Sequence, residues 1–209
     1  MIIAALIKKG NDVTVAFDDG TYQALDYRVV VNNGIWKGQE IDEQKLELLL
    51  YESSFLKAKD SAFRYLGMRL HSSAELKLKL QKKKFSISVI QSVLQYLQKE
   101  NYLNDQDFVT QFTAERVSRK KDGPAKLNAE LLKKGINREL INSVLSRLDQ
   151  ENYFENALSL AERKLFQIMR NETDKRRIVQ KLFAYLTSKG YESDVIRNVV
   201  EKLKLAKED

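Results

Sequence analysis

The stretch SAELKLKLQKKKFSISVIQSVLQYLQKENYLND, residues 73–105, recurs in altered form at residues 124–156 as PAKLNAELLKKGINRELINSVLSRLDQENYFEN. A shift of 51 residues aligns apolar or aromatic side chains throughout, namely Leu76 with Leu127, Leu80 with Leu131, Phe85 with Ile136, Ile90 with Ile141, Val93 with Val144, Leu94 with Leu145, Leu97 with Leu148 and Tyr102 with Tyr153. A fainter third copy follows after a further shift of 55, with Leu182, Leu186, Tyr191, Ile196, Val199, Val200 and Leu203. Self-similarity at such a period predicts tandem structural repeats.

Within each copy the apolar residues recur at helical spacing, as in Ile90, Val93, Leu94 and Leu97, so each copy contains a helix with one hydrophobic stripe. The first copy predicts three helices, ending near Arg69, from Ser73 to about Lys83, and from about Ser86 to Lys99. A single such helix cannot bury its stripe alone. The predicted fold is therefore mostly α, with three tandem three-helix repeats stacked into an elongated, curved array.

Helix-end signals agree with this division. The sequence Ser72-Ser73-Ala74-Glu75 can form a capping box, and Gly123-Pro124 places proline in a first helical turn, where its missing N–H costs little. Gly135 and Gly190 stand where the second helix of a repeat must stop.

The first 57 residues have a different pattern. Residues 2–7 are rich in β-branched side chains, Val13, Val15 and Phe17 alternate with more polar positions, and Asp19-Gly20 suits a tight hairpin turn. A helix from an Asp42 cap through Phe55 is expected next. The predicted divisions are a β-hairpin and helix segment at 1–57 and repeats at 58–105, 106–156 and 157–209.

Composition removes several classes of function. The chain of 209 residues has no cysteine and one histidine, so disulfides, thiolate chemistry and Cys or His zinc sites are excluded. No apolar run reaches the length of a membrane span and the N-terminus lacks the basic flank of a secretory signal, so a cytoplasmic protein without membrane contact is expected. No phosphate-binding glycine loop or metal-hydrolase motif occurs, so we expect no enzyme activity, no catalytic residues, no metal and no cofactor.

The formal net charge of +7 raises the question of nucleic acid. Residues 1–57 carry a net charge of −3, whereas the three predicted repeats carry +5, +1 and +4. The candidate contacts to nucleic acid are the clustered cations Lys82, Lys83, Lys84, Arg116, Arg119, Lys120, Lys121, Lys133, Lys134, Arg170, Lys175, Arg176 and Arg177.

Two interpretations of these cations stay open. Lys83, Lys134 and Lys189 share one repeat position at a helix C-terminus, where a cation is favourable whatever the protein binds. Residues 116–121 are expected to lie on an extended exposed loop, where four cations could contact phosphate.

Other polar and aromatic residues favour structural roles. His71 lies in an interhelical turn, where a surface or capping role is expected. Aspartates at 18–19 and at 105 and 107 suit a hairpin turn and a helix N-terminus better than a metal site. Most of Tyr65, Tyr102, Phe108, Phe112 and Tyr153 are expected in the core.

Three strings resemble the RecX family, bacterial regulators of the RecA recombinase. They are YLGMRLHSSAEL at 65–76, NYLNDQDF at 101–108 and GPAKLNAELLKKGI at 123–136. They are similar to the family patterns Arg-x-x-Ser-x-x-Glu-Leu, Gly-Tyr-Leu-Asp-Asp-x-x-Phe and Gly-Pro-x-Lys-Leu-x-x-Glu-Leu-x-x-Lys-Gly-Ile, although Asn101 and His71 replace the usual Gly and Arg. The resemblance covers residues 58–205 well.

The resemblance implies a monomeric protein that binds along the RecA–DNA filament and lowers ATP hydrolysis and strand exchange. The listed cations would then face filament or DNA. The alternative is a non-specific nucleic-acid-binding protein that acts without a recombinase, which the basic charge alone would explain.

Overall fold

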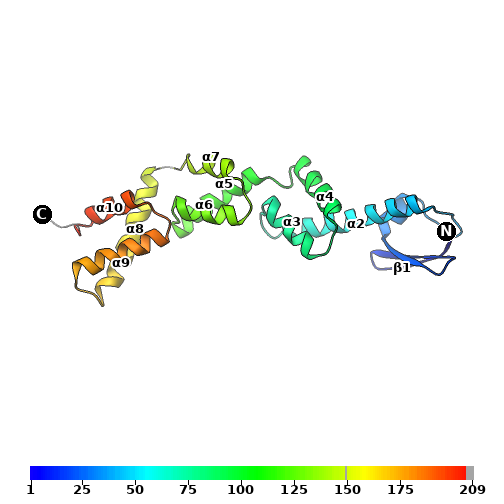
Figure 1. Cartoon of the computed structure of the whole chain (residues 1–209), viewed down its shortest axis with the longest axis horizontal. Coiled ribbons are helices and arrows are strands. Elements are labelled where there is room, and N and C mark those ends of the chain that lie inside the picture. Colours follow the sequence, from blue (N-terminus) through cyan, green and yellow to red (C-terminus); the bar gives the residue numbers. More distant parts are fainter. Residues whose placement is uncertain (149, 206–209) are drawn as a thin grey trace. The chain divides into compact units, whose positions relative to one another are not determined.

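A computed structural model describes residues 1–148 and 150–205 and shows the protein to be mostly helical with a small N-terminal sheet (Figure 1). The chain divides into two compact units, residues 1–103 and the residues from Asn104 onward. Among the described residues no helix is long and apolar enough to cross a membrane. The predicted elongated stacking of the repeats remains a prediction.

The N-terminal sheet has three antiparallel strands in the order β1-β2-β3, which are β1 (Ile3–Lys9), β2 (Asp12–Phe17) and β3 (Tyr22–Asp26). The predicted turn between β2 and β3 is confirmed, with Gly20 at φ +83°. Val13, Val15 and Phe17 alternate on the buried face as the sequence pattern predicts.

Two helices follow the sheet, α1 (Tyr27–Asn32) and α2 (Glu43–Leu66). The predicted cap is confirmed, since the Asp42 carboxylate accepts a hydrogen bond of 2.7 Å from the Lys45 amide. The expected end near Phe55 is wrong, because α2 is 24 residues long, extends to Leu66 and meets no Gly or Pro before Gly67.

Helix α2 serves two hydrophobic cores. Near its start Leu49 packs with the buried face of the sheet. Further along, Ala58 and Ala62 are fully buried against α3 (Ser73–Lys82) and α4 (Ile87–Lys99). The predicted boundary at 57 therefore lies inside a helix, and the end of α2 is the first helix of the first repeat.

The second unit contains two more groups of helices. The first comprises α5 (Asp105–Glu115), a five-residue π-helix (Arg116–Lys120), α6 (Pro124–Lys133) and α7 (Arg138–Leu145). The second comprises α8 (Gln150–Met169), α9 (Lys175–Ser188) and α10 (Ser193–Lys202). Helix α8 crosses the predicted boundary at 156.

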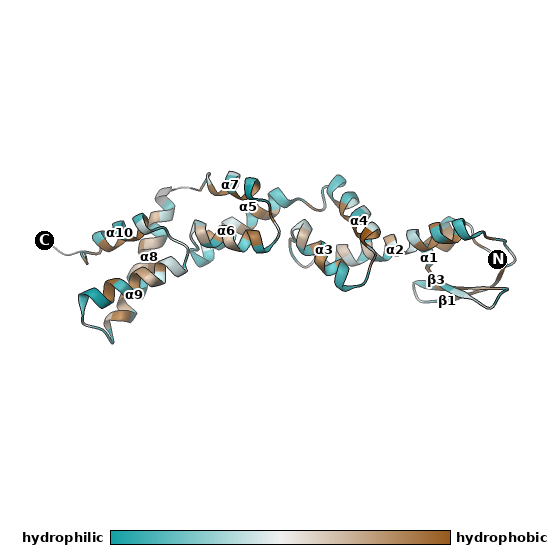
Figure 2. Ribbon diagram, viewed as in Figure 1, coloured by the Kyte–Doolittle hydropathy of each residue, from teal (hydrophilic) through white to brown (hydrophobic). Residues whose placement is uncertain are grey.

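Two positions of the repeat alignment are fully buried in all three repeats. Leu76, Leu127 and Leu182 are equivalent and fully buried, as are Ile90, Ile141 and Ile196. Figure 2 shows hydrophobic and hydrophilic residues on the same helices of each group, which is the expected amphipathic pattern. The predicted caps are also confirmed, with a capping box at Ser72 and Pro124 in the first turn of α6.

Candidate interaction surfaces

The cluster Lys82–Lys84 lies at the C-terminal end of α3, with all three side chains exposed. Lys84 adopts the left-handed conformation at φ +64°. The equivalent positions in the next two repeats are Gly135 at φ +74° and Gly190 at φ +89°. The same turn therefore ends the second helix of all three repeats, and only the first repeat makes it with a bulky residue.

The lysine preceding this turn contacts an aromatic ring in every repeat. The Nζ atom lies 5.7 Å from the ring centroid of Tyr65 for Lys83, 5.3 Å from that of Phe112 for Lys134, and 5.7 Å from that of Tyr185 for Lys189. Cation–π contacts of this kind stabilise the local packing. These contacts favour the structural interpretation for Lys83 and Lys134. Lys133, which precedes Lys134 in the chain, is exposed.

Residues 116–121 do not form the exposed loop that was expected. Arg116 begins the π-helix, and its side chain is only 17% exposed because the guanidinium pairs with Glu130 and lies 3.5 Å from the buried carboxylate of Asp122. The Lys121 ammonium donates a 2.6 Å hydrogen bond to the Ser159 hydroxyl. Only Arg119 and Lys120 of the four predicted cations are exposed.

Asp122 explains this rearrangement. Its side chain is completely buried, and the Lys126 ammonium lies 2.8 Å from its Oδ1 atom. Because a buried carboxylate needs cations and donors around it, Arg116 and Lys126 turn inward. The sequence showed the cations of this segment but did not show which acidic side chain would be buried beside them.

The same segment joins the second and third repeats within the second unit. The Tyr191 hydroxyl donates to the Lys121 carbonyl at 2.8 Å, and the Gly123 amide donates to the Lys189 carbonyl at 2.7 Å. Sequence reasoning assigned Gly123 and Gly190 to separate helix ends and missed that they contact each other.

The cluster at 170–177 flanks the connection between α8 and α9. Arg170, Lys175, Arg176 and Arg177 are exposed. The Nε atom of Arg177 lies 3.9 Å from Asp174, a loose surface ion pair. The structure adds a neighbour that sequence reasoning missed, since Phe166 is 71% exposed and its ring centroid lies 5.9 Å from the Arg170 guanidinium carbon.

His71 is buried, so the expected surface role is wrong. It is 3% exposed, and its Nδ1 atom lies 2.9 Å from the Arg69 carbonyl oxygen. Burial is the main reason that the pKa of His71 is lowered. Of the aromatic residues expected in the core, Tyr102 alone is largely exposed, at 56%.

In the described part of the chain, no group of three or more His, Cys, Asp or Glu residues could hold a metal ion.

The chain is similar to one protein family along most of its length. Three domain models of this family match in chain order. The RecX first three-helix domain matches residues 58–97, the RecX second three-helix domain matches 104–145 and the RecX third three-helix domain matches 151–200. Relatives include the regulatory protein RecX of Clostridioides difficile strain 630, which is 33% identical over 94% of this chain and 92% of its own. That of Clostridium perfringens strain 13 is 31% identical over 92% of this chain and 90% of its own.

Two solved structures have the same fold. A crystal structure of regulatory protein RecX matches with a TM-score of 0.74 and 24% identity, over 96% of this chain and 98% of that one. A crystal structure of RecX from Lactobacillus salivarius matches with a TM-score of 0.66 and 23% identity, over 73% of this chain and 98% of that one.

Proposed function

The chain belongs to the RecX family of regulatory proteins, and from that membership we propose that it regulates a RecA recombinase, mainly as an inhibitor. It binds along the RecA–DNA filament as a monomer in the cytoplasm and lowers ATP hydrolysis and strand exchange. It does so by binding alone, without catalytic residues or a cofactor. The observation that carries this proposal is the ordered match of all three family domains.

Exposed cations supply the electrostatic part of the proposed contact. Once Lys83, Arg116, Lys121 and Lys134 are set aside because of the contacts described above, the exposed side chains available for phosphate or acidic protein surface include Lys82, Lys84, Arg119, Lys120, Lys133, Arg170, Arg176 and Arg177. Phosphate contact needs solvent-accessible cations and places little demand on geometry. Arg116 and Lys134 instead make contacts within the second repeat, and Lys121 joins that repeat to α8 through Ser159.

The test is a RecA ATPase assay that depends on single-stranded DNA, with this protein added at increasing ratios to recombinase. We expect the rate to fall as the protein approaches one copy per few recombinase protomers. A matched variant with Arg170, Arg176 and Arg177 changed to Glu should inhibit less at the same ratio. An unchanged ATPase rate at stoichiometric excess would contradict the proposal.

A second candidate function is non-specific nucleic-acid binding without a recombinase, favoured by the exposed cluster at 170–177 beside Phe166. Each lost phosphate contact should lower the slope of log affinity against log salt by about 0.7 for single strands. Phe166→Ala should weaken single-strand binding by roughly 1–3 kcal/mol if a base stacks on the ring. This candidate fails if no DNA binding is detected at low salt.

A further inference from the structure

One face of helix α8 combines an exposed aromatic ring with a cation one turn before it and another one turn after it. Arg163, Phe166 and Arg170 are spaced by three and four residues, so they lie within about 60° of one another around the helix. All three side chains are exposed, and Phe166 is 71% exposed. The sequence search for cationic clusters missed this face, because Arg163 is isolated from other cations in the chain.

The Phe166 ring takes no part in the hydrophobic core of the third repeat. Its chain neighbours Leu165 and Ile168 pack in that core, whereas Phe166 does not. The guanidinium carbon of Arg170 lies 5.9 Å from the ring centroid, so one cation is held beside the ring. The ring is therefore accessible to a binding partner and contributes little to the folding of α8.

The two arginines on this face retain their positive charge for a partner. Within the part of the chain that the structure describes, neither forms an ion pair, and the Arg163 Nε atom donates only a 3.4 Å hydrogen bond to the Ser159 carbonyl of its own helix. Glu162 is the acidic neighbour on α8 and is exposed. Glu172, which follows the helix, is paired with Lys181 at 2.8 Å. The face is thus cationic around an apolar ring.

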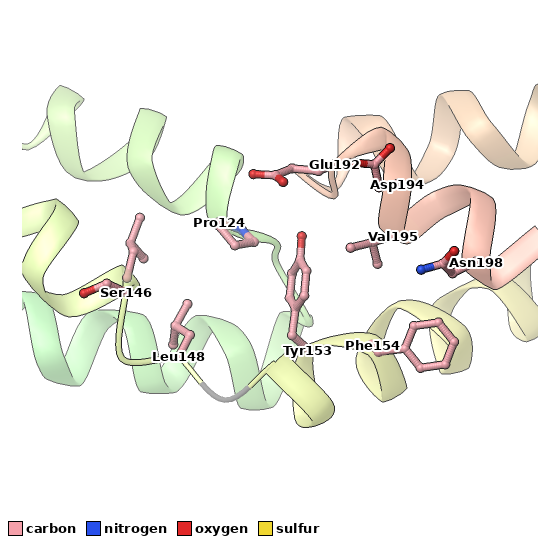
Figure 3. A pocket seen from close by; sticks show the side chains of 10 residues that line it. Pro124, Ser146, Leu148, Tyr153, Phe154, Glu192, Asp194, Val195 and Asn198 are labelled. Carbon is pink, nitrogen blue, oxygen red and sulfur yellow. The ribbon is translucent and has the colours of Figure 1, made fainter.

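The N-terminal end of α8 has the opposite chemistry. It borders a cavity of about 610 Å³ between α7 and the first turns of α8 and α10, where Glu192 and Asp194 lie near Tyr153 (Figure 3). None of the described residues that line this cavity is Lys or Arg. Because carboxylates repel phosphate, a nucleic acid strand is favoured only at the C-terminal half of the helix.

These side chains match the two chemical parts of an unpaired nucleotide. Phosphates bind exposed cations, and the flat face of an unpaired base stacks on an aromatic ring. A duplex keeps its base faces inside the stack and presents only base edges and phosphates. We propose that Arg163, Phe166 and Arg170 form a site for single-stranded nucleic acid, with one base on Phe166 and the neighbouring phosphates on the two guanidinium groups. The inference rests on the nucleic-acid-binding candidate above and specifies the class of strand.

The first test compares the affinities of the full chain for a labelled oligothymidylate and for a duplex of the same length, by fluorescence anisotropy at low salt. Phe166→Ala should weaken single-strand binding roughly tenfold and leave duplex binding unchanged, since only the single strand offers a base face. Arg163→Gln should weaken both. The control Tyr22→Ala removes a ring that is 73% exposed from β3 in the acidic N-terminal segment, and both affinities should stay the same.

Two further variants separate base stacking from general apolar contact. Phe166→Leu keeps an apolar side chain without a ring, so its single-strand affinity should fall as in Phe166→Ala. Phe166→Trp should keep the affinity, and in a Trp36→Phe background it provides the single tryptophan of the chain. The fluorescence of that tryptophan should be quenched by oligothymidylate and unaffected by the duplex. Circular dichroism of each variant checks that the helices are retained.

Several results would overturn the inference. They are an equal loss of single-strand and duplex affinity in Phe166→Ala, native single-strand affinity in Phe166→Leu, and an unquenched Phe166→Trp variant. Loss of RecA inhibition in Phe166→Ala with unchanged single-strand affinity would also overturn it, because a protein would then occupy this face. Undiminished DNA binding by Phe166→Ala removes the inference alone, whereas the absence of any DNA binding at low salt removes the second candidate function with it.

Discussion

A Cβ atom added to Gly123 would lie 2.4 Å from the carbonyl oxygen of Gly190, a distance that no side chain tolerates. The two glycines bring the chain segments before α6 and before α10 into direct backbone contact, and the Ala125 amide donates to the Gly190 carbonyl at 3.2 Å. The second and third repeats are thus joined by main-chain atoms as well as by side chains.

Gly123→Ala should therefore destabilise the protein by about 1–3 kcal/mol, the usual cost of forcing extra atoms into a packed site. Chemical denaturation followed by circular dichroism would measure it. The matched control is Gly67→Ala, where φ is negative and the nearest atom to the new Cβ lies at 3.3 Å. Equal stability of the two variants would contradict the close contact.

Lys84→Gly should stabilise the protein by about 0.5–1 kcal/mol. Lys84 adopts φ +64°, a conformation that disfavours a residue with a side chain, and glycine adopts it at little cost. The control Lys82→Gly, inside the last turn of α3, should destabilise by about 1 kcal/mol because glycine is a poor helix former. Thermal unfolding of both variants checks the two opposite signs.

Arg116→Ala should cost roughly 2–4 kcal/mol of stability, because Glu130 and the buried Asp122 would lose a cation. Arg119→Ala, three residues away, removes an exposed ion pair with Glu115 and should change stability very little. Urea titrations in which Arg119→Ala is the more destabilising change would contradict a stabilising role of Arg116 beside Asp122.

Asp26 should make stability depend on pH in the acid range. Hydrogen bonds from Arg28 are the main reason that the pKa of Asp26 lies below its ordinary value of 3.8. A carboxylate with a lowered pKa in the folded state contributes stability above the ordinary pKa, and this is lost as pH falls through the folded value. The stability difference between the native protein and Asp26→Asn should be constant near neutrality and shrink below about pH 4. A difference that grows on acidification would contradict this sign.

The repeat architecture could be predicted because it depends on local periodicity. The stripe of Leu76 and Leu80 recurs at Leu127 and Leu131, and burying such a stripe requires neighbouring helices. Helix ends with a cap or a glycine stop, such as those at Ser72 and Gly135, could also be predicted, since these signals depend on a few adjacent residues.

Features that join distant residues could not be predicted in this way. The position of Arg116 depends on Asp122 being buried against the third repeat, and the cavity beside Tyr153 depends on Glu192, which comes from a different helix group. The predicted end of this helix near Phe55 is wrong for a related reason. No local sequence signal marks the point at which a helix passes from one hydrophobic core to another, because the apolar residues that face either core recur at the same helical spacing.

The continuity of α2 also determines how the first unit should come apart. Leu49 packs with the sheet, and Ala58 and Ala62 pack with the first repeat, so one rigid element belongs to both. Because a helix forms cooperatively, loss of this element as a whole exposes apolar surface in both cores. The sheet and the first repeat should therefore melt in a single cooperative transition, and their slowest amide protons should exchange with solvent at the same free energy of opening.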